Sequence, residues 1–207
     1  MNKNKTLILV RHAPVKKVDG CIPKNNPSAL INLDHIQKLA YYIPEASSCY
    51  VSPLKRTIQT AKALSKFVNF EDITEAKDLV EQNFGDWAGK RISDVWEELK
   101  HNKSQHIFSF ICPEICPPNG DSYLDQCKRV ANFIDNFNFE NKNSVVLITH
   151  AGTIRAILSH ILEIEPDKSI GIEISHLSCT LIEVINKNHH NHRGGRYRLL
   201  KVNQQII

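Results

Sequence analysis

Two histidines, two arginines and one glutamate lie where charged side chains can act together. Arg11 and His12 directly follow a short apolar run near the amino end. Arg56 lies at the start of a predicted helix, and His150 follows the most apolar run of the chain. Glu81 closes a weaker predicted strand. If these runs are parallel strands, their carboxyl ends meet at one edge of a sheet, where ligands bind.

This set of side chains has a definite chemistry. Two arginines can hold a phosphate through forked, charge-assisted hydrogen bonds, and helix amino ends add positive potential where an anion binds. A histidine with an unprotonated ring nitrogen can attack phosphorus. A buried glutamate can keep its proton to neutral pH and give it to a leaving oxygen. The set therefore predicts phosphoryl transfer through a phosphohistidine, with no metal or other cofactor.

The elements that must position these residues alternate along the chain. Short apolar runs predict strands at 6–10, 49–51, 74–80 and 145–149. Helical spacing predicts helices at 33–43, 53–67, 92–99, 121–137 and 153–162. Two further strands, 178–185 and 196–202, are joined by a polar tip. This order predicts an α/β fold: a three-layer α/β/α sandwich with a mostly parallel central sheet and an antiparallel carboxy-terminal edge.

Three helix starts carry specific predictions. Asp34 is the predicted N-cap of the first helix, and Pro53 opens the second because proline suits a first turn. Asp121 or Ser122 caps the long helix that ends near 137. Prolines interrupt 101–120, which we interpret as a loop-rich excursion. Its apolar residues Phe108, Phe110 and Ile111 either form a lid over the site or only pack.

Composition limits the class of protein. The 207 residues fit one domain spanning 1–207, and 42% hydrophobic with 23% charged residues is typical of a globular chain. The net charge of +4 comes from scattered basic residues, which argues against nucleic acid as a partner. No apolar run is long enough to span a membrane. A homodimer remains open, although no exposed apolar edge strand stands out.

Cysteine usage and the amino end indicate a compartment. The six cysteines are expected to be free thiols, because a chain with a normal core does not need disulfides. The apolar run after the first basic residues is too short for a signal peptide. We therefore expect a cytoplasmic protein. His189, His190 and His192 could bind a metal by composition, but a mobile hairpin tip is the favoured interpretation.

Five stretches together resemble the motifs of the histidine phosphatase superfamily, also called phosphoglycerate-mutase-like. Residues 9–13 (LVRHA) resemble its R-H-G motif, and 52–61 (SPLKRTIQTA) resemble S-x-x-x-R-[AT]-x-[QE]-T-A. Residues 79–89 (LVEQNFGDWAG) are similar to L-x-E-x-x-F-G-x-W-E-G. Residues 118–122 (PNGDS) and 149–152 (THAG) are similar to P-x-G-E-S and [ST]-H-[AG]-G. The five stretches occur in family order.

The resemblance implies a role for each candidate residue. His12 matches the nucleophile that becomes phosphorylated, and Arg11 and Arg56 match the arginines that bind the phosphoryl oxygens. His150 matches the second histidine, which hydrogen-bonds the phosphoryl group. Glu81 matches the proton donor to the leaving alcohol and the later base for water. The implied enzyme is a metal-independent phosphatase.

Departures from the family pattern bear on the substrate. Ala13 stands for the usual glycine, Ala88 for the glutamate of W-E-G and Asp121 for the glutamate of G-E-S. The run RHAPV followed by Gly-x-Cys is similar to an α-ribazole phosphatase-like branch, but Ile22-Pro23 replaces that branch's Tyr-Gly. The expected activity is hydrolysis of a small phosphorylated metabolite, with α-ribazole 5'-phosphate as one candidate.

Three alternatives stay open. A 2,3-bisphosphoglycerate-dependent phosphoglycerate mutase would return the phosphoryl group to another hydroxyl, although no extended set of substrate-holding residues follows the first motif. Phosphohistidine or phosphoserine on a protein could replace a metabolite as substrate. A binding or scaffold module could keep the pocket and lack turnover.

Overall fold

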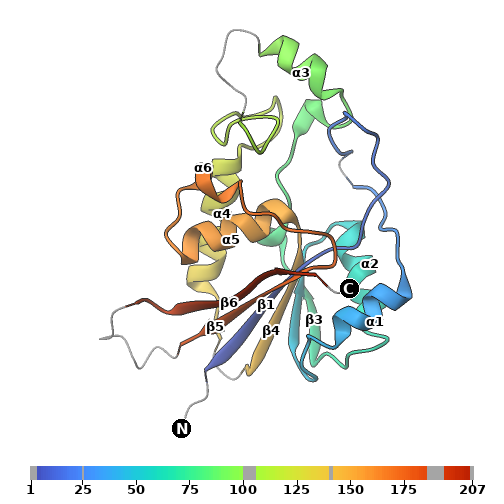
Figure 1. The fold of residues 1–207 in the computed structure, drawn as a ribbon, viewed down its shortest axis with the longest axis vertical. Helices are drawn as coiled ribbons and strands as arrows, with labels where there is room; N and C mark the ends of the chain where they lie inside the picture. The colour runs from blue at the N-terminus through green and yellow to red at the C-terminus, as the bar shows by residue number, and fades with distance from the viewer. Residues whose placement is uncertain (1–3, 25, 100–105, 140–141, 186–193, 206–207) are drawn as a thin grey trace.

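A six-stranded sheet forms the centre of the molecule in a computed structural model, which describes residues 4–205 except 25, 100–105, 140–141 and 186–193 (Figure 1). Its strand order is β3-β2-β4-β1-β5-β6. The strands are β1 Lys5–Arg11, β2 Ser48–Val51, β3 Asp72–Glu75, β4 Ser144–Thr149, β5 Cys179–Val184 and β6 Tyr197–Gln204. The first four strands are parallel, whereas β5 is antiparallel to β1 and β6 to β5. The predicted fold class is confirmed.

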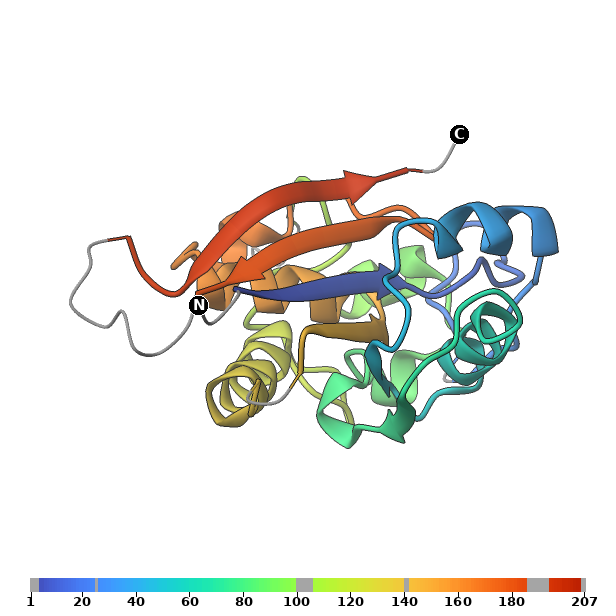
Figure 2. The same cartoon turned by 90° about the horizontal axis from the view of Figure 1, so that it is seen from below.

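Alternation along the strands produces two cores, one on each face of the sheet. In β1, Leu7 and Leu9 pack with one cluster, and Ile8 and Val10 pack with the other. The first face is covered by α4 (Tyr123–Asn136) and α5 (Ala151–Ile161), and the second by α1 (Leu33–Ala40) and α2 (Lys55–Leu64). Figure 1 places these two pairs on opposite sides of the strands, and Figure 2 shows β6 at the outer edge of the twisted sheet.

A third, smaller apolar cluster lies beyond the end of the sheet. It contains Ile22, Trp87, Val95 and Ile111, from segments far apart in the sequence. Its elements are the short helix η2 (Gly85–Trp87) and the helix α3 (Ile92–Glu98), whereas Leu79 of the preceding short helix η1 (Lys77–Leu79) packs in the first core. Residues 106–120 contain no helix or strand, as predicted from their prolines. None of the helices in the described part of the chain is long and apolar enough to cross a membrane.

The structure corrects the predicted starts of several helices. The N-cap of α1 is Asn32, whose Oδ1 accepts from the amides of Asp34 and His35, so the cap is not Asp34. The helix α2 begins at Lys55, because Leu54 is still extended after Pro53. Ser122, and not Asp121, caps α4, in a capping box with Asp125.

The predicted bounds of the third strand, 74–80, were wrong. Strand β3 covers only Asp72–Glu75, since its partner β2 offers four residues for pairing. After a bond from the amide of Ala76 to Val51, the chain turns into η1. Glu81 therefore follows a 3₁₀ helix and not a strand, which leaves its position to be set by other contacts.

The carboxy-terminal third agrees with prediction in type and order. The helix α5 begins at Ala151, two residues before the predicted start, and the β5–β6 hairpin forms as expected. A short helix, α6 (Pro166–Ser169), was not predicted. Most of the tip between β5 and β6, with His189, His190 and His192, lies outside the described residues.

Candidate active site

His12 is placed directly after the end of β1, where its backbone amide bonds the carbonyl of Thr149 at 3.0 Å. Its ring Nδ1 donates to the carbonyl of Ala13 at 2.7 Å, so the proton of the neutral ring belongs on Nδ1. Nε2 is then an acceptor, and the Nε–H of Arg56 donates to it at 3.1 Å. The ring nitrogen that faces Arg56 thus carries a lone pair.

The surroundings keep His12 uncharged. Its side chain is buried, and burial is the main cause that lowers the pKa of His12 to about 2, with His150 adding to the shift. At neutral pH the Nε2 lone pair is therefore available. Ala13, which stands where the family has glycine, is fully buried in the apolar cluster of the second face, and its amide donates to Thr60 Oγ1 at 2.9 Å.

Arg11 and Arg56 present unpaired donors to this site. Among the described residues, Arg11 Nε and Arg56 Nη1 are buried without a hydrogen-bond partner, while Arg11 Nη1 donates to the carbonyl of Ile174 at 2.5 Å. Burial lowers the pKa of Arg11 to about 10 and also lowers that of Arg56, although the nearby Glu81 charge opposes both shifts. Both guanidinium groups stay cationic at neutral pH, and unpaired buried donors of this kind are costly unless an acceptor arrives.

His150 lies at the start of α5, opposite His12. It is fully buried, its ring centroid is 5.1 Å from that of His12, and its Nε2 lies 2.7 Å from Ser52 Oγ. Burial, with the charges of Arg56 and Arg11, lowers the pKa of His150 well below its ordinary value. Its Nδ1 is buried without a partner in the described structure. His150 can therefore offer a further polar contact to a bound anion.

Contacts with α4 and α5 position Glu81. Gln126 Nε2 donates to Glu81 Oε1 at 2.8 Å, and the amide of Gly152 donates to Oε2 at 3.2 Å. A Cβ at residue 152 would lie only 2.3 Å from Oε1. Glycine at this position is therefore what lets the carboxylate reach the start of α5.

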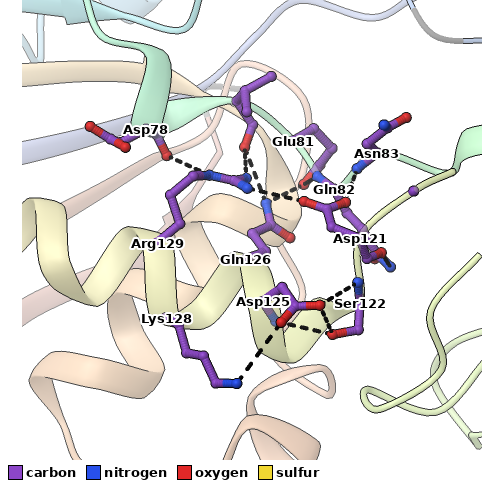
Figure 3. Close-up of polar contacts among 12 residues, drawn as sticks. Asp78, Glu81, Gln82, Asn83, Asp121, Ser122, Asp125, Gln126, Lys128 and Arg129 are labelled. Carbon is purple, nitrogen blue, oxygen red and sulfur yellow. Dashed lines mark hydrogen bonds and ion pairs between the residues drawn. The ribbon is translucent and has the colours of Figure 1, made fainter.

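A polar network ties the segment before and after Glu81 to α4 (Figure 3). Arg129 donates to the carbonyls of Val80 at 2.8 Å and Asp78 at 3.3 Å, and its Nη1 pairs with Asp121 at 3.0 Å. The Asp121 carboxylate also accepts from the amide of Asn83. Asp121 can thus hold this segment although the family pattern has glutamate there. The motifs at 79–89 and 118–122 are structurally one unit.

His176 is a site residue that sequence reasoning missed. Its Nδ1 donates to the carbonyl of His12 at 3.1 Å, its ring centroid is 5.1 Å from that of His12, and its Nε2 is buried without a partner in the described chain. Burial and the charge of Arg11 lower the pKa of His176 to about 4. The other site residues lie at or after the carboxyl ends of strands, whereas His176 precedes β5. Because β5 is antiparallel, its beginning lies at the same edge, and this signal could have found it.

One cavity of about 470 Å³ brings these residues together. Arg11, His12, Arg56, Glu81 and His176 line it, and His150 is in ring contact with His12 behind it. The five predicted residues therefore converge, while their chemical roles remain predictions. Within the described residues, no group of three or more His, Cys, Asp or Glu side chains is arranged to hold a metal ion. The arrangement is suited to binding a phosphate beside a neutral imidazole.

The sequence model of the histidine phosphatase superfamily (branch 1) matches residues 7–194. The chain belongs to this superfamily. A 2,3-bisphosphoglycerate-dependent phosphoglycerate mutase from Thermoplasma acidophilum is 30% identical over 135 residues, which are 65% of this chain and 62% of that protein. Phosphoserine phosphatase 1 from Hydrogenobacter thermophilus is 25% identical over 86% of each chain. This histidine phosphatase superfamily member thus resembles both phosphatases and mutases.

Solved structures agree with the fold. A mycobacterial glucosyl-3-phosphoglycerate phosphatase has a TM-score of 0.77 and 17% identity, covering 98% of this chain and 100% of that one. An Escherichia coli protein proposed to be an alpha-ribazole-5'-P phosphatase has a TM-score of 0.76 and 18% identity, covering 99% of this chain and 100% of that one. At these identities the likeness concerns the fold alone.

Proposed function

We propose that this histidine phosphatase superfamily member is a phosphomonoester hydrolase that acts on a small phosphorylated metabolite through a phosphohistidine. The observation that carries the proposal is the lone pair of His12 Nε2, held beside the buried guanidinium of Arg56. A neutral nucleophile next to unpaired cationic donors is the arrangement that phosphoryl transfer needs.

In the first step the phosphate displaces the hydrogen bond between Arg56 and His12. Arg11 and Arg56 then bind the equatorial phosphoryl oxygens, joined by His150. The Nε2 lone pair of His12 forms a bond to phosphorus as the bond to the ester oxygen breaks. Glu81, as the carboxylic acid, gives its proton to the departing oxygen, and the alcohol leaves.

In the second step water attacks the phosphohistidine. Glu81, now a carboxylate, takes a proton from this water as its oxygen bonds to phosphorus. The N–P bond breaks, inorganic phosphate forms, and His12 recovers its Nε2 lone pair. Because Nδ1–H donates to the carbonyl of Ala13, that contact can stabilise the positive charge on the ring in the phosphorylated state.

A phosphoglycerate mutase is the second candidate, favoured by the 30% identity to the Thermoplasma acidophilum mutase. It would share the first step and pass the phosphoryl group to a second hydroxyl instead of water. The likeness of RHAPV to the α-ribazole phosphatase-like branch supports α-ribazole 5'-phosphate as one substrate to include.

The test is an assay of para-nitrophenyl phosphate hydrolysis with a chelator present, for the wild type and His12→Ala. The proposal predicts turnover that the chelator leaves unchanged and the substitution abolishes. Turnover equal in both proteins would contradict it. Transfer between phosphoglycerates that exceeds release of phosphate would favour the mutase. Tight phosphate binding without turnover of any ester would instead favour a binding module.

A further inference from the structure

A second cavity of about 620 Å³ adjoins the first and differs from it in character. The two cavities share Pro23, Glu81, Gln82 and Phe84 as lining residues. Glu81 lies at the junction, which is where the proposed mechanism places the oxygen of the leaving alcohol. A substrate with its phosphorus at His12 therefore has the second cavity directly in reach of its alcohol.

The walls of the second cavity are apolar and aromatic. Residues 107–111 (IFSFI) form one side, and Phe84, Ile92 and Trp96 form another. Ile107 and Phe108 are 86% and 65% exposed, so the structure leaves large apolar surfaces open to solvent here. Apolar surface gathered at a ligand-sized hollow is typical of a binding site.

This wall is fixed in place from both sides. Trp96 Nε1 of α3 donates to the carbonyl of Phe110 at 2.7 Å, and the ring of Phe110 lies 5.4 Å from that of Phe84. At the other end, His106 Nε2 lies 3.2 Å from the carbonyl of Asp167, close to α6. A Cβ on Gly171 would lie 3.2 Å from the ring of Phe108, so that ring rests on the backbone after α6. The sequence left open whether these apolar residues form a lid or only pack. In the structure they pack as a wall of the cavity that is held by contacts on both sides.

Charge separates the two cavities. The catalytic cavity is lined by Arg11, Lys17, Lys24 and Arg56, which suit an anion. Among the described residues lining the second cavity, only Glu81 and Arg155 are charged, and Arg155 Nε already donates to the carbonyl of Ile172 at 2.7 Å. Away from Glu81 and the remaining N–H groups of Arg155, a charged amine or carboxylate on the alcohol would lose water in the described lining without gaining a matched partner.

We propose that the second cavity binds the alcohol part of the substrate, and that this part is a bulky, uncharged, apolar group such as a flat ring. The inference rests on the proposed phosphatase function. It favours such esters over O-phosphoserine, glycerol phosphate or phosphoglycerate. Apolar surface on the ligand would cover the side chains that are now exposed at residues 107 and 108.

The test compares esters whose leaving alcohols have closely similar reactivity, so that differences report binding. We expect 3-phenylpropyl phosphate to have a kcat/KM at least about tenfold above propyl phosphate, mostly through KM. O-phosphoserine is expected to be poorer than propyl phosphate. Equal kcat/KM for the phenylpropyl and propyl esters, or a preference for O-phosphoserine, would overturn the proposal while leaving the phosphatase function intact.

Substitutions at residues 107–111 test whether this side of the cavity causes the preference for the phenylpropyl ester. Phe108→Ser removes an exposed ring that contributes to the cavity, and the preference for the phenylpropyl ester should fall roughly fivefold. Tyr41→Ser is the matched control, because Tyr41 is an 85% exposed aromatic residue that lines neither cavity. An unchanged preference in Phe108→Ser and in a second wall variant, Phe110→Ser, would exclude this cavity as the alcohol site.

Binding of inert phosphonates makes the inference independent of turnover. Calorimetry with 3-phenylpropylphosphonate and propylphosphonate should show tighter binding of the former in the wild type, and a smaller difference in Phe108→Ser. If no ester is hydrolysed but this difference is found, the proposed function fails and the cavity assignment stands. If the two phosphonates bind equally, the cavity assignment fails.

Discussion

We expect Gln126 to control how fast the protein hydrolyses esters whose leaving alcohol needs a proton. It is fully buried in α4, and its Nε2 donates to Glu81 Oε1 at 2.8 Å and to Thr153 Oγ1 at 3.0 Å. Gln126→Met keeps the approximate shape of the side chain and removes both bonds. The amide of Gly152 would still hold Oε2, so Glu81 should loosen without leaving the site.

The size of the effect follows from these contacts. A positioned general acid contributes on the order of 10²–10⁴ to rate, and the substitution removes the side-chain contact that aims it and leaves the backbone amides of Gln82 and Gly152. We therefore expect kcat/KM for an alkyl phosphate to fall about tenfold or more. Para-nitrophenyl phosphate has an acidic leaving group that needs little protonation. Its kcat/KM should therefore change by less than about threefold.

The assay is kcat/KM, which reports the steps up to release of the alcohol, for both esters in wild type, Gln126→Met and Val130→Ala. Val130 is fully buried in the same helix, about one turn further along, and its truncation should cost about 1–3 kcal/mol of stability without touching Glu81. The control should keep the ratio of the two rates. An equal loss on both esters in Gln126→Met would mean that Gln126 acts on folding or phosphate binding, and the positioning argument would be wrong.

Further predictions concern the phosphate site, the glycine beside Glu81 and the effect of acid. Arg56→Ala should lower kcat/KM about 10²–10³-fold, and steady-state kinetics would contradict the site if the loss were below about threefold. Gly152→Ala should reduce alkyl ester turnover more than nitrophenyl ester turnover, because its methyl would displace Glu81. The lowered pKa of His12 means that the unfolded chain takes up a proton below about pH 6.5 while the folded chain does not. Stability should therefore fall as pH decreases from there, by up to about 1.4 kcal/mol per pH unit for this residue; urea unfolding at several pH values should show a shallower fall in His12→Asn.

The order of elements along the chain, the mostly parallel sheet and the residues at the ends of its strands could be predicted from the sequence. Arg11 is the last residue of β1 and His12 follows it, and His150 follows β4, whose six residues are all buried. These strand ends could be predicted because each strand is an apolar run bounded by polar residues, which is a local pattern in the sequence. The convergence of these side chains then follows from the parallel pairing of strands.

Other parts depend on tertiary contacts that no local pattern contains. Glu81 reaches the site through Gln126 and Gly152, from distant helices. The N-cap of α1 fell on Asn32 rather than Asp34 because either type can cap, and the choice depends on the path of the incoming chain. The wall at 107–111 is set by Trp96 and by the backbone near α6, and the prolines that follow it at 113, 117 and 118 predicted only irregular structure.

The most direct test of the account is to find where the phosphoryl group goes. Wild-type protein is mixed rapidly with para-nitrophenyl phosphate, quenched in alkali to preserve phosphohistidine, and mapped by peptide mass spectrometry. The account predicts one phosphoryl group on His12, bonded to Nε2, and none in His12→Asn. A phosphoryl group on any other residue of the wild type, or hydrolysis that persists in His12→Asn, would contradict it.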